Sequence, residues 1–188
     1  MLGLLDIFFP EKPYQKANRI LRALSEWQTD TVEERLELGG LDVLGAGAYG
    51  VVIDNGDTVV KYVRANDQGY RAFLDICIAH PSPYFPVVFW TEMVNNEILA
   101  VCLEKLDDFE QFMFDDGSDP LALEYETLEE LIEDRLVPAN AELAEAAALL
   151  NMTSRNMRDI AKVFLGQDLC WNNVMLRGNQ LVITDPWC

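Results

Sequence analysis

Three glycines recur in the run GAGAYGVV, and the stretches on both sides of this run predict β-strands. Leu41 to Leu44 precede it, while Thr58 to Val63, rich in β-branched side chains, follow after the turn Asn55-Gly56-Asp57. The spacing G-x-G-x-x-G-x-V is formed by Gly45, Gly47, Gly50 and Val52. A dinucleotide-binding domain would require a helix directly after these glycines. A strand on both sides excludes that fold and predicts antiparallel strands joined by a glycine-rich turn.

The remaining hydrophobic pattern predicts an α+β fold. Two further strands, at 86–90 and 98–103, complete a five-stranded antiparallel sheet, with a helix at 67–79 inserted after its third strand. An amphipathic helix is expected at 12–27, followed by a polar link at 29–37. The second half is expected to be helical, with helices near 127–136, 140–150 and 153–165, before two short strands at 174–176 and 181–183.

The charge and cysteine content limit the cellular setting and the partners. The 188 residues carry a net charge of -18, which opposes direct binding to nucleic acid because that requires clustered Lys and Arg. The four cysteines contain no C-x-x-C pair, which argues against zinc and disulfides and fits a reducing cytoplasm. The apolar start MLGLLDIFF is too short to span a bilayer and lacks the basic region of a signal peptide. A soluble, cytoplasmic protein without membrane binding is therefore expected.

Lys61 lies within the apolar strand VVKYV. A lysine in such a strand is costly to bury unless its ammonium group meets an anion, and a phosphate held under the glycine-rich turn would be a suitable anion. The simpler alternative is a lysine on the solvent-exposed face of an edge strand. Likewise, the glycine motif alone is compatible with a hairpin that binds no ligand.

Two acidic residues and an amide near the C-terminus favour a ligand-binding site over these structural alternatives. Asp168 and Asn173 have the spacing D-x-x-x-x-N, and the apolar run at 181–183 leads directly to Asp185. Oxygen ligands of this kind suit Mg²⁺, and phosphoryl transfer also needs a carboxylate that orients the attacking hydroxyl. Each residue has a structural reading, Asp168 as a turn cap and Asp185 as a strand end. Together with the glycines and Lys61, however, they predict a phosphoryl-transfer site.

From about Leu41 to Trp187 the chain resembles the protein-kinase superfamily. The segment QDLCWNNVMLRGNQLVITDPW is most similar to the early serine/threonine kinases of short-tailed bacteriophages. The resemblance implies that Gly45, Gly47, Gly50 and Val52 cover ATP, and that Lys61 holds its α- and β-phosphates. It also implies that Asp168 is the catalytic base, that Asn173 and Asp185 bind Mg²⁺, and that the backbone from Glu104 to Leu106 reads the adenine.

The sequence departs from the kinase pattern in several places. Gly166-Gln167 stands where His-Arg usually precedes the catalytic Asp, and Pro186-Trp187 replaces Phe-Gly after the metal-binding Asp. The predicted helix at 67–79 offers Asp67, which we favour, or Asp75 as the acidic partner of Lys61, in place of the usual Glu. Because the chain stops three residues after Asp185, without an activation segment, a reduced helical C-lobe is expected.

The resulting hypothesis is a single bilobal, protein-kinase-like domain, with an N-terminal helix and linker at 1–40, an N-lobe at 41–106 and a C-lobe at 107–188. Its expected activity is ATP- and Mg²⁺-dependent phosphorylation of Ser or Thr on host proteins, in the cytoplasm of the host cell, during host takeover. One alternative is a catalytically weak, kinase-shaped scaffold whose acidic surface binds and inhibits a basic host protein. A small-molecule phosphotransferase is a third reading, and homodimerisation stays open.

Overall fold

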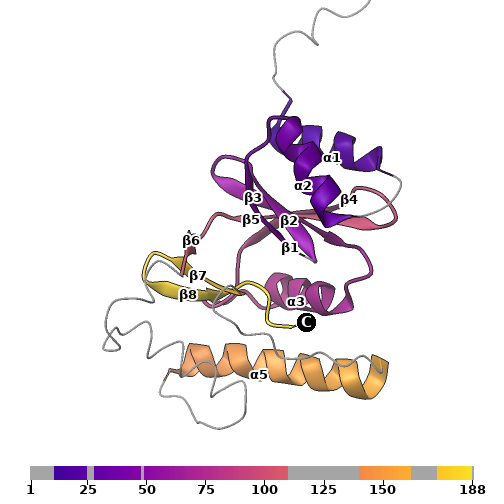
Figure 1. The fold of residues 1–188 in the computed structure, drawn as a ribbon. Coiled ribbons are helices and arrows are strands. Elements are labelled where there is room, and N and C mark those ends of the chain that lie inside the picture. The colour runs from indigo at the N-terminus through magenta and orange to yellow at the C-terminus, as the bar shows by residue number, and fades with distance from the viewer. Residues whose placement is uncertain (1–10, 25–27, 48, 110–139, 162–172, 188) are drawn as a thin grey trace, which may run out of the picture. The chain divides into compact units, whose positions relative to one another are not determined.

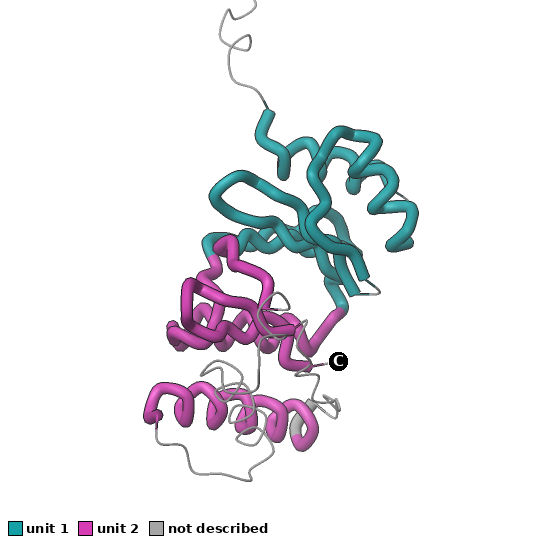
Figure 2. Tube along the Cα trace, turned by 60° about the vertical axis from the view of Figure 1, so that its left-hand side comes forward, with its two compact units in different colours: residues 1–66, 89–103 teal, residues 67–88, 104–188 magenta. Residues whose placement is uncertain are grey.

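The computed structural model describes residues 11–24, 28–47, 49–109, 140–161 and 173–187. Contacts divide the chain into two compact units, which are treated separately below (Figure 2). Unit 1 consists of Met1–Asn66 and Phe89–Leu103, and unit 2 consists of Asp67–Val88 and Glu104–Cys188. The segment predicted as the N-lobe, 41–106, therefore contributes its inserted helix to unit 2.

A five-stranded antiparallel sheet confirms the predicted α+β class. Its strands are β1 (Val43–Gly47), β2 (Gly50–Asp54), β3 (Thr58–Arg64), β4 (Val88–Met93) and β5 (Ile98–Glu104). The strands follow the order β1-β2-β3-β5-β4, so β1 and β4 form the edges. The predicted first strand begins two residues later than expected and continues into the glycine motif, because Gly45, Ala46 and Gly47 pair with β2.

Two helices pack on one face of this sheet (Figure 1). The first, α1 (Pro13–Arg22), lies within the predicted helix at 12–27, while α2 (Thr29–Leu38) occupies the segment that was expected to be a polar link. That expectation was wrong because Val32 and Leu36, one turn apart, are fully buried although the rest of the segment is polar or charged. They join a core cluster that also includes strand residues such as Ile53 and Tyr62.

Unit 2 contains the predicted inserted helix, α3 (Gln68–Ala79), and a small three-stranded sheet. This sheet is formed by β6 (Asp107–Asp108), β7 (Val174–Arg177) and β8 (Gln180–Ile183), which confirms the two short C-terminal strands. Phe73 of α3 makes edge-to-face ring contacts with Phe85 and Trp187. These aromatic contacts join α3 to one residue that precedes the small sheet in sequence and to another that follows it.

In the part of the second half that the structure describes, one helix is longer than expected. This helix, α5 (Ala141–Asn156), runs through the predicted break between Leu150 and Thr153 and continues into the π-helical turn Met157–Ala161. Asn140 caps it by accepting hydrogen bonds from the backbone amides of Glu142 and Leu143. The helix predicted at 127–136 lies outside the described residues. No helix in the described ranges is long and apolar enough to cross a membrane.

Each unit also contains a buried cysteine. Cys102 of β5 belongs to the core cluster of unit 1, and Cys77 of α3 is buried in unit 2. Burial raises the pKa of the Cys77 thiol to about 12, so this side chain is neutral at physiological pH.

Candidate functional site

The strand register aligns three of the predicted nucleotide-binding residues in one row. Gly45 of β1 lies opposite Val52 of β2, and Val52 in turn lies opposite Lys61 of β3. Residues that are directly opposite in antiparallel strands project from the same face of a sheet. The sheet of unit 1 therefore presents Gly45, Val52 and Lys61 side by side.

This row is on the face opposite to α1 and α2. The neighbouring residues in the strands, Val51, Val60 and Tyr62, are fully buried in the core cluster that includes both helices. Since side chains alternate between the two faces of a strand, Val52 and Lys61 point away from the helices. Both are only half-buried. A face that carries a lysine beside a glycine-rich hairpin is suited to an anionic ligand.

The three glycines of the motif differ in whether the packing of the strands leaves room for a side chain. A Cβ atom on Gly50 would lie 2.5 Å from the carbonyl oxygen of Tyr62, so the packing of β2 against β3 excludes any side chain there. At Gly45 and Gly47 a Cβ atom would meet nothing within 4 Å among the described residues, and neither glycine has a positive φ. Because glycine in a strand is otherwise unfavourable, these two positions are consistent with close approach of a ligand to the backbone.

The two predicted metal-binding residues lie at the open end of the β7–β8 hairpin in unit 2. The backbone amide of Thr184 donates a 2.8 Å hydrogen bond to the carbonyl oxygen of Asn173, so Asp185 follows directly after the residue that pairs with Asn173. Both side chains are half-buried. Burial raises the pKa of Tyr70 well above its usual value, and the negative charge of Asp185 adds to this increase. The carboxylate of Asp185 therefore acts electrostatically on the Tyr70 side chain.

Asp67, favoured from the sequence as the acidic partner of Lys61, has a structural task in unit 2. Its carboxylate accepts a 2.9 Å hydrogen bond from the backbone amide of Tyr70 and caps the N-terminus of α3. Asp75, the other candidate, is exposed on the same helix. The cap was recognisable in the sequence as an Asp directly before a run of helix-forming residues. The pairing of Lys61 with either acid stays a prediction.

Glu104 is held by a residue that the sequence did not single out. Its carboxylate accepts a 2.9 Å hydrogen bond from Nε of Arg177 and a second, very short one from Nη2, and the pair also forms an ion pair. Burial by itself would raise the pKa of Glu104, but the hydrogen bonds from Arg177 and from the Val87 amide, with the charge of Arg177, lower it. The side chain of Glu104 is therefore an ionised anchor. Leu106, two residues further, is half-buried.

The predicted catalytic base, Asp168, lies outside the described residues. Within the described residues, no cluster of three or more His, Cys, Asp or Glu side chains is arranged to hold a metal ion. The structure thus aligns the predicted phosphate-binding residues in unit 1 and brings the two predicted metal ligands to one hairpin end in unit 2.

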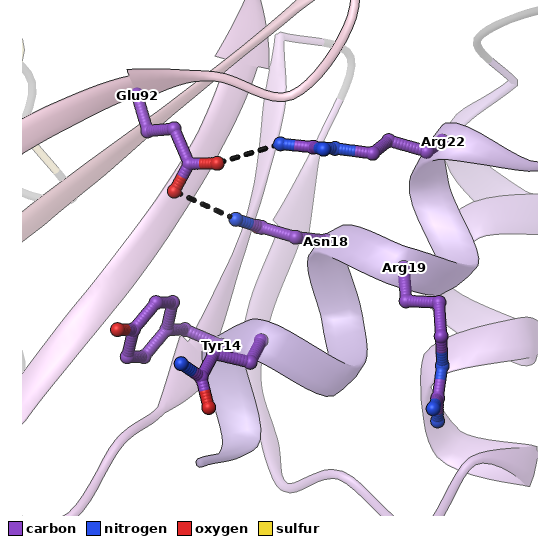
Figure 3. Close-up of a pocket in the computed structure, with 6 residues that line it drawn as sticks. Tyr14, Asn18, Arg19, Arg22 and Glu92 are labelled. Atoms are coloured by element: carbon purple, nitrogen blue, oxygen red, sulfur yellow. Dashed lines mark hydrogen bonds and ion pairs between the residues drawn. The ribbon is translucent and has the colours of Figure 1, made fainter. Parts of the chain in front are cut away.

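Unit 1 also has a pocket of about 360 Å³ between α1 and β4 (Figure 3). It is lined by Tyr14, Gln15, Asn18, Arg19, Arg22 and Glu92. Glu92 accepts hydrogen bonds from Arg22 at 2.7 Å and from Asn18 at 3.1 Å, which link the helix to the edge strand. Because Trp90, two residues before Glu92, packs on the core cluster with α1, this pocket lies on the helix-covered face of the sheet. It is distinct from the row that ends at Lys61.

No protein-family model matches the chain, and no curated protein matches it significantly. The resemblance to kinases therefore rests on the sequence motifs alone.

Proposed function

We propose that this protein is an ATP- and Mg²⁺-dependent kinase that transfers the γ-phosphate to Ser or Thr hydroxyls of other proteins. The observation that carries the proposal is the row Gly45–Val52–Lys61 on the face of the sheet opposite to α1 and α2. It is the arrangement expected of a sheet that receives a nucleotide, with an apolar side chain between a bare backbone and a cation. The bilobal, kinase-like reading of the two units belongs to this proposal.

In unit 1, the roles follow from the chemistry of each residue. The backbone around Gly45 and Gly47 has no side chains to keep phosphate oxygens at a distance, and its amides are potential donors. The ammonium group of Lys61 would neutralise the α- and β-phosphates. Val52, between them in the row, offers an apolar surface for the nucleoside.

In unit 2, Asn173 and Asp185 provide the two kinds of oxygen that Mg²⁺ accepts, an amide carbonyl and a carboxylate. Both belong to the open end of one short hairpin, which fits them as a pair of ligands. When bound, the metal neutralises charge on the phosphates. Asp168 would accept the proton of the attacking hydroxyl, as the resemblance to phage kinases implies. That resemblance is also the source of the proposed setting, which is modification of host proteins in the host cytoplasm.

The net charge of -18 favours a second candidate function. An acidic, kinase-shaped scaffold would bind a basic host protein through complementary charge and need no nucleotide. A small-molecule phosphotransferase is a third candidate, but nothing in the chain suggests which compound it would bind. Phosphoryl transfer is preferred to the scaffold because it accounts for the glycine motif, the strand lysine and the C-terminal acids together, and the resemblance to phage kinases favours a protein as the acceptor.

Incubation of the natural chain and of Asp168→Ala with a cell extract and γ-labelled ATP tests the proposal. Labelled Ser or Thr residues on extract proteins are expected with the natural chain, and loss of the proton acceptor should reduce labelling by about 100-fold or more. Equal labelling by both chains would contradict catalysis by this site. Under the scaffold hypothesis, neither chain labels any protein, while both retain the same basic partner.

A further inference from the structure

Arg177, at the end of β7, joins three separate segments of unit 2. Its Nε and Nη2 donate hydrogen bonds to the two carboxylate oxygens of Glu104. Its Nη1 donates a 2.9 Å bond to the carbonyl oxygen of Pro83, and Nη2 donates another of 2.9 Å to that of Phe85. Four bonds from one guanidinium group use almost all of its five N–H donors. The side chain is therefore held by four hydrogen bonds to three residues.

Glu104 is fixed as completely as its partner. The Oε1 atom that accepts from Arg177 also accepts a 2.7 Å hydrogen bond from the backbone amide of Val87. The backbone amide of Glu104 donates a 3.1 Å bond to the carbonyl oxygen of Val87. Both the main chain and the side chain of Glu104 are thus hydrogen-bonded to the backbone of Val87, and Arg177 holds the same carboxylate.

These residues also lie where the chain passes from one unit to the other. The passages occur between Val88 and Phe89 and between Leu103 and Glu104. Glu104 is the first residue of unit 2 after the second passage, and Val87 lies one residue before the end of unit 2 at the first. The network holds these two residues together. Only 16% of the Glu104 side chain is exposed, so an ionised carboxylate there depends on its partner.

We propose that Arg177 is a positioning residue for adenine recognition: it holds Glu104 so that the backbone of Glu104 to Leu106 can bind the base. The proposal rests on the proposed function, because it requires the protein to bind a nucleotide. The side chain of Glu104 then serves as an anchor and makes no contact with the nucleotide. The backbone carbonyl group of Glu104 and the backbone of the next two residues recognise the adenine.

A lysine cannot replace Arg177 in this role. Its ammonium group is a point charge with three donors, whereas the planar guanidinium reaches both carboxylate oxygens and two carbonyl groups at once. Arg177→Lys keeps the charge and removes this geometry, and the segment from Glu104 to Leu106 should lose its fixed position. Because adenosine contains the base and lacks phosphates, it separates an effect on this segment from an effect on the phosphate site.

The experiment measures the Kd of ATP and of adenosine for the full natural chain, Arg177→Lys and Lys61→Met. Arg177→Lys should weaken both ligands by a similar factor, about tenfold, as expected for loss of charge-assisted hydrogen bonds. It should raise the KM for ATP more than it lowers kcat, and it should speed hydrogen exchange at the Val87 amide. Lys61→Met should weaken ATP far more than adenosine. Arg158→Lys, an exposed arginine paired only with its neighbour Asp159 among the described residues, is the matched control.

Four outcomes separate the possibilities. Parallel weakening of ATP and adenosine by Arg177→Lys, with Arg158→Lys unchanged, supports the proposal. Unchanged affinities in a folded Arg177→Lys chain, or weakening of ATP alone, overturn it while leaving the kinase function intact. Failure of the natural chain to bind either ligand overturns the proposed function and this inference with it. If Arg177→Lys does not fold, Glu104→Gln is measured in its place, with the same expected pattern.

Discussion

Val52 lies directly opposite Lys61 across β2 and β3, on the face of the sheet that does not contact α1 and α2. Val52 provides an apolar surface beside the ammonium group of Lys61, and Gly45 is the next residue in the row. A register shift of one residue would turn both side chains toward the core and expose the tyrosine beside them. Burial of Tyr62, whose hydroxyl donates to the Tyr14 carbonyl oxygen, therefore fixes the orientation of Lys61.

Alanine at each glycine of the motif should give two different results. Gly50→Ala should lower the free energy of unfolding by roughly 1–3 kcal/mol because its Cβ atom collides with the Tyr62 carbonyl group. Gly45→Ala and Gly47→Ala should leave stability unchanged or raise it by up to about 1 kcal/mol. The same two variants should weaken ATP binding by roughly tenfold or more, since small displacements of bound phosphates are costly. Thermal unfolding and ATP titration measure the two effects, and normal ATP binding by Gly45→Ala and Gly47→Ala would refute close ligand approach.

Replacement of Lys61 by methionine keeps most of the length of the side chain and removes its charge. We expect kcat/KM for ATP to fall by about 100-fold to 1000-fold, as for loss of an electrostatic group that acts on the transition state. The melting temperature should change little because the side chain is only half-buried. Lys12→Met, at an exposed position before α1, is the control for loss of a positive charge. Full activity of Lys61→Met would show that the lysine has no phosphate role.

Asp185→Asn removes one negative charge and retains an oxygen ligand. The Kd of ATP measured in Mg²⁺ should rise by at least about tenfold, since metal sites lose affinity readily when ligand charge or support is altered. The Kd measured in EDTA should stay the same or fall, because a carboxylate near the phosphates is then absent. Asp30→Asn, at an exposed position in the first turn of α2, is the matched control. An equal loss of affinity with and without Mg²⁺ would argue against metal binding by Asp185.

The anchor Glu104 predicts a specific pH dependence of stability. Its pKa is lower in the folded protein than the ordinary value of 4.5, so its ionised form stabilises the fold above about pH 4.5. This stabilisation should disappear as the pH falls below 4.5 and through the folded-state pKa. The difference in melting temperature between the natural chain and Glu104→Gln should therefore be large at pH 7 and shrink on acidification. A difference that is the same at pH 7 and pH 3 would show that the charge is unimportant.

The sequence was most informative where the relevant pattern was local. Short runs of apolar and β-branched residues and the Asn-Gly turn predicted the strands. The glycine and lysine spacing was sufficient to identify the residues that the register then aligned. It failed for α2, where two buried residues among charged ones leave a weak helical pattern. It could not identify Arg177, whose acceptors on Glu104, Pro83 and Phe85 lie 73 to 94 residues away. Such a network depends on tertiary folding and leaves no spacing signature.

Two cysteines among the described residues are buried, one in each unit, and the reactivity of each reports the local opening of that unit. Cys102 is enclosed in unit 1 and Cys77 in unit 2, so each unit contains one thiol that a modifying reagent reaches only after that unit opens. With Cys170 and Cys188 replaced by serine, the two labelling rates would separately give the opening free energy of each unit. Addition of ATP should then show directly which unit a nucleotide stabilises.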